Sequence, residues 1–363
     1  MEKANLQFRP TLDHDEIRQR LGRLVVPGPI DDRGMESRIS RLEERFRVYA
    51  ACSPHGLWAP GLALTQEMRV TAEAYLPLAE IQRTFRRLLA LSLQYNPFLP
   101  ASTLHTSTNW LDALHRLQPL VREANPSRLL RRLMADEDHR CRFLFFLFLP
   151  HHYGGTFDRY PAQGTLLRNW LTTTRPAGVV RCLDAACGSG EGSYELAMLL
   201  LDRGYAPENL EVHGATVEPL ELFAAAHGWF PHDPERQTAY RRRIRRLFAN
   251  RTAERIVFYQ EDLIEEEGAA GEAYDVIICN GLLGGPLLNE RKKLAGTVGR
   301  LCARLKPGGI LLAADRFHGG WKRTTPADVL GKMLAGNGLT LLTSCEGVAG
   351  VKQTRRTVIG TGH

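Results

Sequence analysis

The segment from Leu183 to Gly192 constrains the fold of this chain more than any other. It reads Leu-Asp-Ala-Ala-Cys-Gly-Ser-Gly-Glu-Gly, after an apolar stretch with Val179 and Val180 and before a helical pattern that starts near Tyr194. Glycine tolerates backbone conformations and close approaches that a Cβ forbids. The helix that follows offers unpaired N–H groups to a polar or anionic group. The segment therefore predicts a strand, a tight turn and a helix start around a ligand.

The pattern after this turn indicates a sheet. From about residue 178, apolar runs of strand length alternate with helical stretches, which is typical of a mostly parallel sheet with helices on both faces. The expected strands are 179–184, 210–216, 256–260, 274–279, 309–314, 339–344 and 356–360. The expected helices are 194–203, 222–227, 234–250, 289–305 and 327–335. Because a short segment joins the last two strands, they should be antiparallel. We predict an α/β fold with a doubly wound, mostly parallel, seven-stranded, Rossmann-like sheet.

The first 150 residues have a different pattern. Apolar residues recur three and four positions apart, and proline-containing joints separate the periodic stretches. The expected helices are 16–24, 36–50, 68–93, 110–121 and 128–133. We expect an all-α domain or cap over residues 1–150, followed by a ligand-binding domain over residues 151–363.

Composition excludes several classes of protein. The chain has 363 residues, of which 44% are hydrophobic and 24% charged, as in ordinary globular domains. Its longest apolar run, residues 143–149, is far shorter than the roughly 20 residues of a membrane span. The N-terminus lacks an apolar signal-peptide core, so we expect a cytoplasmic protein without membrane insertion. The cysteines and histidines show no zinc-ligand spacing, so we expect no metal site.

Polar residues follow the predicted strands at the edge where ligands bind in open parallel sheets. Asp184 ends the first strand, where a carboxylate can hold a cation. Glu218, after the second strand, can accept both hydroxyls of a ribose. The alignment of this acid with the end of the strand can shift by one residue. Asp262, after the third, can accept an adenine amino group beside the Leu263 N–H. S-adenosylmethionine, a nucleoside with an acid and an amine, fits this edge. The expected cofactor-binding residues are Asp184, Ala186, Gly188, Gly190, Glu218, Asp262, Leu263 and Asn280.

Other segments carry weaker signals. Asn280 follows the fourth strand and opens a glycine-rich loop, where its amide can contact ligand or substrate or cap a turn. His318, after the fifth strand, can act as a general base or be a surface histidine. The arginine-rich stretch 241–246 can contact phosphate or an acidic protein, or form a solvated helix face.

Taken in order, these segments resemble class I S-adenosylmethionine-dependent methyltransferases, and most of all the chemotaxis receptor (CheR-type) methyltransferase family. The family's Ala-Ala-Cys-x-x-Gly-Glu and Tyr-Ser-Leu-Ala-Met-Leu-Leu motifs are similar to residues 185–200. Its Phe-Asp-Val-Ile-Phe-Cys strand is similar to residues 274–279, and its Leu-Lys-Pro-Gly-Gly to residues 305–309. The resemblance covers roughly residues 150–315. It implies an enzyme that methylates a protein carboxylate.

Two segments depart from the family pattern. The family's Thr-x-Phe-Phe-Arg carries an arginine at the cofactor and substrate, and the nearest match here is Thr-Phe-Asp-Arg-Tyr at residues 156–160. The resemblance implies that Arg159 holds the donor carboxylate or orients the substrate. After the fourth strand, the family's Cys-Arg-Asn-Val-Leu-Ile-Tyr-Phe is replaced by Cys-Asn-Gly-Leu-Leu-Gly-Gly-Pro, without the tyrosine. The expected catalytic residues are Arg159, Asn280 and His318.

Three other functions stay open from the sequence. The first is a small-molecule O-, N- or C-methyltransferase with the helical domain as a substrate lid. The second is a nucleic-acid methyltransferase, against which the sequence argues because no Asn/Asp-Pro-Pro-Tyr/Phe motif follows the fourth strand. The third is a non-enzymatic binding module that uses the arginine-rich stretch. The methyl acceptor is thus open between an acidic protein and a small molecule, and the sequence fixes no oligomeric state.

Overall fold

The chain forms two compact units by internal packing. The computed structural model describes residues 6–53, 56–59, 61–97, 102–118, 120–149, 156–264, 273–314, 325–344 and 346–353. The sheet unit comprises the described residues of Met1–Leu12, Pro150–Trp229 and Thr238–His363. The helical unit comprises those of Asp13–Leu149 and Phe230–Gln237. The predicted domain boundary at residue 150 stays a prediction.

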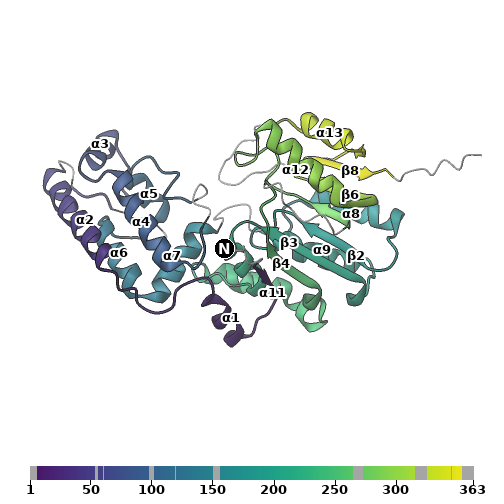
Figure 1. Cartoon of the computed structure of the whole chain (residues 1–363), viewed down its shortest axis with the longest axis horizontal. Coiled ribbons are helices and arrows are strands. Elements are labelled where there is room, and N and C mark those ends of the chain that lie inside the picture. Colours follow the sequence, from purple (N-terminus) through teal and green to yellow (C-terminus); the bar gives the residue numbers. More distant parts are fainter. Residues whose placement is uncertain are drawn as a thin grey trace, which may run out of the picture. The chain divides into compact units, whose positions relative to one another are not determined.

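A mixed sheet is the centre of the sheet unit (Figure 1). Its described strands are β1 (Gln7–Phe8), β2 (Val180–Asp184), β3 (Leu210–Thr216), β4 (Ile256–Gln260), β5 (Tyr274–Ile278), β6 (Leu305–Ala313), β7 (Leu339–Leu342) and β8 (Val348–Lys352). Their order in the sheet is β1-β4-β3-β2-β5-β6-β8-β7. The pairs among β2 to β6 are parallel, whereas β1–β4, β6–β8 and β7–β8 are antiparallel. This confirms the predicted α/β class and its antiparallel end.

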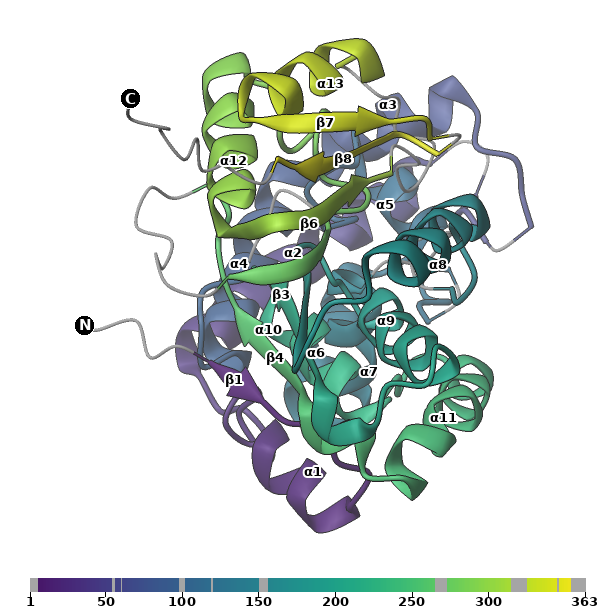
Figure 2. The same ribbon diagram turned by 90° about the vertical axis from the view of Figure 1, so that its right-hand side faces the viewer.

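Helices cover both faces of the sheet (Figure 2). They are α8 (Pro161–Thr174), α9 (Glu191–Asp202), α10 (Pro219–His227), most of α11 (Pro234–Ala249), α12 (Arg291–Arg304) and α13 (Ala327–Gly336). On one face, apolar residues of α12 and α13 pack into a cluster with alternate residues of β2, β5 and β6, including Leu183, Ile277 and Leu311. On the other face, α9 meets α10, where the Tyr194 hydroxyl donates to the Ala225 carbonyl at 2.9 Å.

Parallel register brings the strand ends that carry the predicted site to one edge. Asp184 of β2 lies beside Gly214 of β3 and Ile278 of β5, and Thr216 of β3 lies beside Gln260 of β4. The residues that follow β2, β3, β4 and β5 therefore leave the sheet side by side. This edge is where open parallel sheets bind ligands.

The structure corrects the number of strands. The described sheet has eight strands rather than seven, because Gln7 and Phe8 pair antiparallel with Tyr259 and Phe258 in a region predicted to be helical. A two-residue strand is too short to show period-2 alternation, so the sequence pattern could not predict it.

The last hairpin also differs from the prediction. Its second strand is β8, whereas the predicted strand 356–360 lies outside the described residues. Strand β6 begins at Leu305, four residues before the predicted start at residue 309. Helix α8 was not predicted, because its polar residues and Pro161 obscure the helical period.

The helical unit contains seven complete helices among its described residues. They are α1 (His14–Leu21), α2 (Arg33–Cys52), α3 (Gln66–Tyr75), α4 (Leu78–Ser92), α5 (Trp110–Leu117), α6 (Pro126–Ala135) and α7 (Glu137–Phe148). Side chains of Asp13, Asp32, Thr65, Asn109, Asn125 and Asp136 cap six of them by accepting main-chain N–H bonds. The predicted helix 68–93 is broken at Pro77, which ends α3 and starts α4.

None of the helices in the described part of the chain is long and apolar enough to cross a membrane.

Candidate functional site

A braced glycine loop, residues 185–190, connects β2 to α9. The Cys187 N–H donates to the Ala215 carbonyl at 2.9 Å, and the Gly190 N–H closes the turn on the Cys187 carbonyl at 2.8 Å. From α11, the Tyr240 hydroxyl donates to the Ser189 carbonyl at 2.7 Å. The loop is therefore held by β3 and α11 and does not depend on a ligand for its shape.

Two glycines of this loop have left-handed backbone conformations for different reasons. Gly190 has a φ of 89°, and a Cβ there would lie 2.7 Å from the Ala225 Cβ and 3.1 Å from the Phe258 ring. Gly188 has a φ of 50°, and among the described residues apart from its chain neighbours, only Glu221 has an atom within 4 Å of its ideal Cβ. Gly190 thus lets the loop pack on the protein, whereas Gly188 leaves space beside the loop, where a ligand can approach the main chain.

Asp184 is a buried carboxyl below the loop. Its side chain is 3% exposed, and its Oδ2 accepts the Ser193 hydroxyl at 2.9 Å. Burial, together with the negative charges of the neighbouring Glu195 and Glu191 carboxylates, raises the pKa of Asp184 to about 7. Hydrogen bonds from Ser193 and the Ala186 main chain act in the opposite direction. A nearby cation would therefore stabilise the ionised form of Asp184.

Two more carboxyls of α9 surround Asp184. Glu191, 4% exposed, accepts the Ser189 hydroxyl at 2.8 Å. Glu195 accepts the Asp158 N–H, and burial raises the pKa of Glu195 to about 7. The start of α9 thus concentrates negative charge where a helix N-terminus alone would favour an anion. This environment suits a ligand that carries positive charge.

Two acids of α10 lie near the end of β3, and they have different partners. Glu218, the predicted ribose acceptor, is 5% exposed and caps α10, because its Oε1 accepts the Leu220 N–H at 3.2 Å. Glu221 is half-buried, and its Oε2 accepts the hydroxyl of Thr216, the last residue of β3, at 2.7 Å. Its other oxygen, Oε1, lies 4.0 Å from the ideal Cβ position of Gly188.

Glu221 was not predicted from the sequence, because it lies inside α10 rather than at the end of the preceding strand. It lies one helical turn beyond Glu218. The proline that follows Glu218 was the sequence signal that Glu218 caps a helix. Glu218-Pro219 is a cap followed by a first-turn proline, so a capping role for Glu218 was predictable.

Helix α12 holds the segment after β4. The Leu263 carbonyl accepts the Thr297 hydroxyl at 3.1 Å and the Arg300 guanidinium at 2.6 Å. The Asp262 Oδ1 accepts the Ile264 N–H at 2.8 Å, which makes a local turn and leaves the side chain half-buried. Asp262 and Leu263 therefore have a fixed main chain at the edge of the sheet, as a base-binding segment requires.

Asn280, after β5, belongs to an amide pair. Its Oδ1 accepts the Gln163 amide at 3.0 Å and the Ala314 N–H at 2.8 Å, while its own amide donates to the Gln163 Oε1 at 2.8 Å. The Gln163 N–H donates to Glu346, a carboxyl that is 5% exposed, at 3.0 Å. Asn280 thus connects the ends of β5 and β6 to α8. Gln163 and Glu346 were missed, because local sequence carries no signal for partners 117 and 183 residues apart.

Arg159 lies in the short segment before α8. The segment is held against α9 through the bond between Asp158 and Glu195 and against α11 through the ring contact of Phe157 with Tyr240 at 5.2 Å. Arg159 is half-buried, with its guanidinium 5.0 Å from the centre of the Tyr160 ring. The predicted base, His318, lies outside the described residues.

The arginine-rich stretch 241–246 has several partners inside the sheet unit. Arg241 donates to the Gly228 carbonyl, Arg243 pairs with Asp158 at 2.8 Å, and Arg246 pairs with Asp202 at 2.8 Å. Because these arginines already have partners within the unit, fewer of them can contact an acidic protein. No group of three or more metal-binding side chains occurs among the residues that the structure describes.

Residues 162–315 match the family model described as the CheR methyltransferase, SAM binding domain. This range runs from the start of α8 to just beyond β6, and it contains the glycine loop and the strand ends described above. The chain is a class I S-adenosylmethionine-dependent methyltransferase, similar to the CheR family. Its cofactor is S-adenosylmethionine, as the sequence predicted.

The chain is also similar to parts of several solved structures. A TehB-like SAM-dependent methyltransferase from Corynebacterium glutamicum is 14% identical, with a TM-score of 0.34 over 52% of this chain and 87% of that chain. The N-methyltransferase NodS from Bradyrhizobium japonicum, in complex with S-adenosyl-L-homocysteine, is 16% identical, with a TM-score of 0.36 over 62% of this chain and 97% of that chain. Magnesium protoporphyrin IX methyltransferase from Synechocystis is 15% identical, with a TM-score of 0.36 over 62% of this chain and 94% of that chain. No curated protein matches the chain.

Replacement of Gly190 by alanine should destabilise the methyltransferase. Gly204→Ala is the matched control, because Gly204 has a similar φ of 84° but nothing within 4 Å of its ideal Cβ. Both variants carry the cost of a left-handed alanine, about 1 kcal/mol. Only Gly190→Ala adds the overlap with Ala225, and overpacking costs typically 1–3 kcal/mol more. Urea denaturation followed by circular dichroism measures the difference, and equal losses in the two variants would contradict the packing role of Gly190.

Proposed function

We propose that this methyltransferase transfers the methyl group of S-adenosylmethionine to a carboxylate side chain of a protein. The match of residues 162–315 to the CheR SAM-binding domain is the observation that carries the proposal. A carboxylate is already ionised at neutral pH, so its methylation needs no general base. In agreement, the polar side chain that follows β5 is the amide of Asn280, which is held by Gln163 and by the Ala314 main chain.

The side chains around the glycine loop fit the proposed cofactor. When bound, S-adenosylmethionine supplies a sulfonium methyl group, and the acceptor oxygen forms a bond to the methyl carbon as the carbon–sulfur bond breaks, which leaves S-adenosylhomocysteine. Asp184, with Glu191 and Glu195 near it, would attract the ammonium group and the sulfonium of the donor. Arg159 would hold the donor carboxylate or orient the acceptor. Positioning of this kind can contribute roughly 7–11 kcal/mol to catalysis.

We assign the ribose to Glu221 rather than to Glu218. The Glu218 carboxylate is buried and caps α10, whereas the Glu221 carboxylate faces the end of β3 and the space beside Gly188. A carboxylate there can accept both ribose hydroxyls. The hydroxyl of Thr216, at the last position of β3, would orient Glu221 for this contact.

The remaining residues would hold the adenine and shape the acceptor side. Asp262 would accept the adenine amino group, and the Leu263 N–H would donate to a ring nitrogen, with the main chain fixed by Thr297 and Arg300. The Asn280–Gln163 pair would line the acceptor side next to the strand ends. His318 would be needed as a base only for a phenol or alcohol acceptor.

Affinity for S-adenosylhomocysteine should fall as the pH drops below about 7. The Asp184 carboxyl, with a pKa of about 7, attracts the ammonium group of the ligand only when it is ionised, so protons compete with the ligand below that pH. The expected slope approaches about tenfold per pH unit. Calorimetric titration at a series of pH values measures it. Asp184→Asn should remove most of the dependence, and the same slope in wild type and Asp184→Asn would contradict the assignment.

Glu221→Gln should weaken S-adenosylhomocysteine binding roughly tenfold or more, because hydrogen bonds to a charged group contribute about 1.5–3 kcal/mol each. Glu218→Gln is the control on the same helix turn. It should lower the free energy of unfolding through the lost cap and change the affinity little. Calorimetry and urea denaturation of both variants separate the two effects. A larger loss of affinity in Glu218→Gln than in Glu221→Gln would show that Glu218, and not Glu221, binds the ribose.

Methyl transfer to protein carboxylates should give a label that is released by base. We expect tritium from S-adenosyl-[methyl-³H]methionine to enter the protein fraction of a lysate and to leave it as methanol at alkaline pH. Heat-treated enzyme and the Asp184→Asn variant provide the background. Label found only in small molecules, or stable to base on protein, would exclude a carboxyl ester as the main product.

A further inference from the structure

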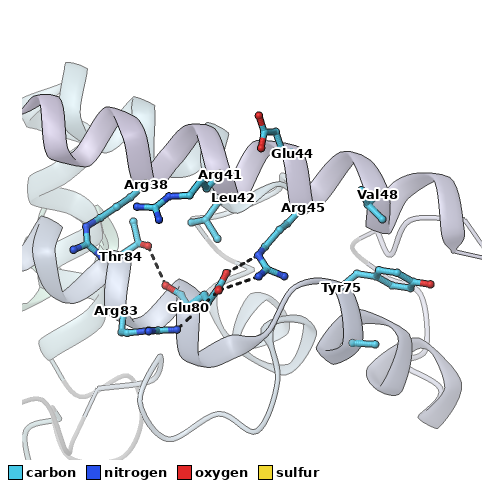
Figure 3. Close-up of a pocket in the computed structure, with 11 residues that line it drawn as sticks. Arg38, Arg41, Leu42, Glu44, Arg45, Val48, Tyr75, Glu80, Arg83 and Thr84 are labelled. Carbon is cyan, nitrogen blue, oxygen red and sulfur yellow. Dashed lines mark hydrogen bonds and ion pairs between the residues drawn. The ribbon is translucent and has the colours of Figure 1, made fainter.

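The helical unit contains a groove lined by arginines, separate from the glycine loop and the strand ends (Figure 3). It lies between α2 on one side and the end of α3 with the start of α4 on the other. Its lining residues are Arg38, Arg41, Leu42, Glu44, Arg45, Val48, Ala74, Tyr75, Glu80, Arg83 and Thr84. The cavity has a volume of about 520 Å³.

Three of the arginines share one face of α2. Arg38, Arg41 and Arg45 are three and four residues apart, so their side chains follow one another along the helix surface. Arg83 of α4 faces them from the other wall. Packing of like charges along one helix face is unfavourable unless anions neutralise them.

The Glu80 carboxylate neutralises part of this charge. Glu80 pairs with Arg45, with 2.6 Å between Oε2 and Nε, and lies 3.9 Å from Arg83. Arg38 and Arg41 are exposed and make no hydrogen bond or ion pair with another residue that the structure describes. Glu44 points away from Glu80 and Arg83 in Figure 3. At the end of the groove near Arg38, guanidinium groups are therefore exposed to solvent, and no described carboxylate pairs with them.

The other end of the groove is apolar. Tyr75 and Val48 stand there, on the opposite side of the Arg45–Glu80 pair from Arg38 (Figure 3). Both are large hydrophobic side chains that stay exposed, at 36% and 49%. Leu42 is buried below the arginines. The groove thus offers cations at one end and an aromatic ring at the other, about 15 Å apart along α2 at about 1.5 Å per residue.

Size decides between a small ligand and a protein partner. Sites for small molecules have volumes of about 300–1,000 Å³, and the groove lies inside this range. A stable protein partner needs about 800 Å² of contact on each side, which is more than this groove supplies by itself. Guanidinium groups bind phosphate oxygens in paired, charge-assisted hydrogen bonds.

We propose that this groove binds a small phosphorylated molecule that carries a planar ring, of the nucleoside polyphosphate class. The phosphates contact Arg38, Arg41 and Arg83, and the ring packs on Tyr75 beside Val48. All its lining residues belong to the helical unit, so the proposal does not rest on the proposed function.

Calorimetric titration of the full chain tests the site, with GTP, inorganic tripolyphosphate and guanosine as probes. A chelator removes divalent cations, and excess S-adenosylhomocysteine occupies the cofactor site. GTP should bind more tightly than tripolyphosphate, and guanosine should not bind measurably. The double variant Arg38→Gln/Arg41→Gln should weaken GTP and tripolyphosphate by roughly tenfold or more. Tyr75→Ala should weaken GTP alone, because ring stacking contributes about 1–3 kcal/mol.

Arg47→Gln is the matched control, because Arg47 is an exposed arginine of α2 that does not line the groove. It should leave both affinities unchanged. The proposal is overturned if neither phosphate probe binds, if the double variant binds as the wild type does, or if Arg47→Gln weakens binding equally. Binding of a poly-glutamate peptide without binding of GTP would replace it with an acidic protein partner. Equal affinities for GTP and tripolyphosphate, unchanged by Tyr75→Ala, would remove the ring from the proposal.

Discussion

The contact between the glycine loop and α10 is the constraint on which the rest of the site depends. At Gly190 the main chain lies so close to Ala225 and Phe258 that no side chain fits. This approach brings the start of α9 over the ends of β2 and β3, and it places Asp184 beneath the loop and Glu221 beside it. The Tyr240 hydroxyl and the Cys187 N–H hold the loop in the same position. Because these contacts are internal to the protein, the loop is formed before a cofactor arrives.

The charge at this edge explains how a helix N-terminus can serve a positively charged cofactor. A helix start by itself favours anions. Here Asp184, Glu191 and Glu195 are grouped around the first two turns of α9, and burial raises the pKa of Asp184 and of Glu195 to about 7. Carboxyls that are costly to ionise in the free protein gain most from a bound cation.

Much of the fold could be predicted from the sequence because its signals are local. Apolar runs of four to seven residues predicted β2 to β5 to within one residue and β6 and β7 to within four, and the Gly188 to Gly192 turn predicted the loop before α9. Prediction failed where the signal was short or masked by polar residues, as at β1 and α8. Asn280 was placed after the fourth predicted strand, and it lies just after β5. Its partner Gln163, and the Glu346 carboxylate that accepts the Gln163 N–H, could not be predicted, because only the packing of α8 and the last hairpin brings them together.

The sequence by itself determined the order of elements along the chain: a parallel sheet, a glycine turn after its first parallel strand, and acids at its strand ends. These features could be predicted because hydrophobic periodicity and glycine spacing are properties of neighbouring residues. Only the tertiary structure decided which partners the two acids after β3 have. Glu218 and Glu221 are three residues apart and chemically equal, but the fold uses the first to cap α10 and turns the second toward Thr216 and Gly188. Likewise, the arginines of α2 become a groove only because α3 and α4 pack beside them, since facing walls come from segments that are distant in the sequence.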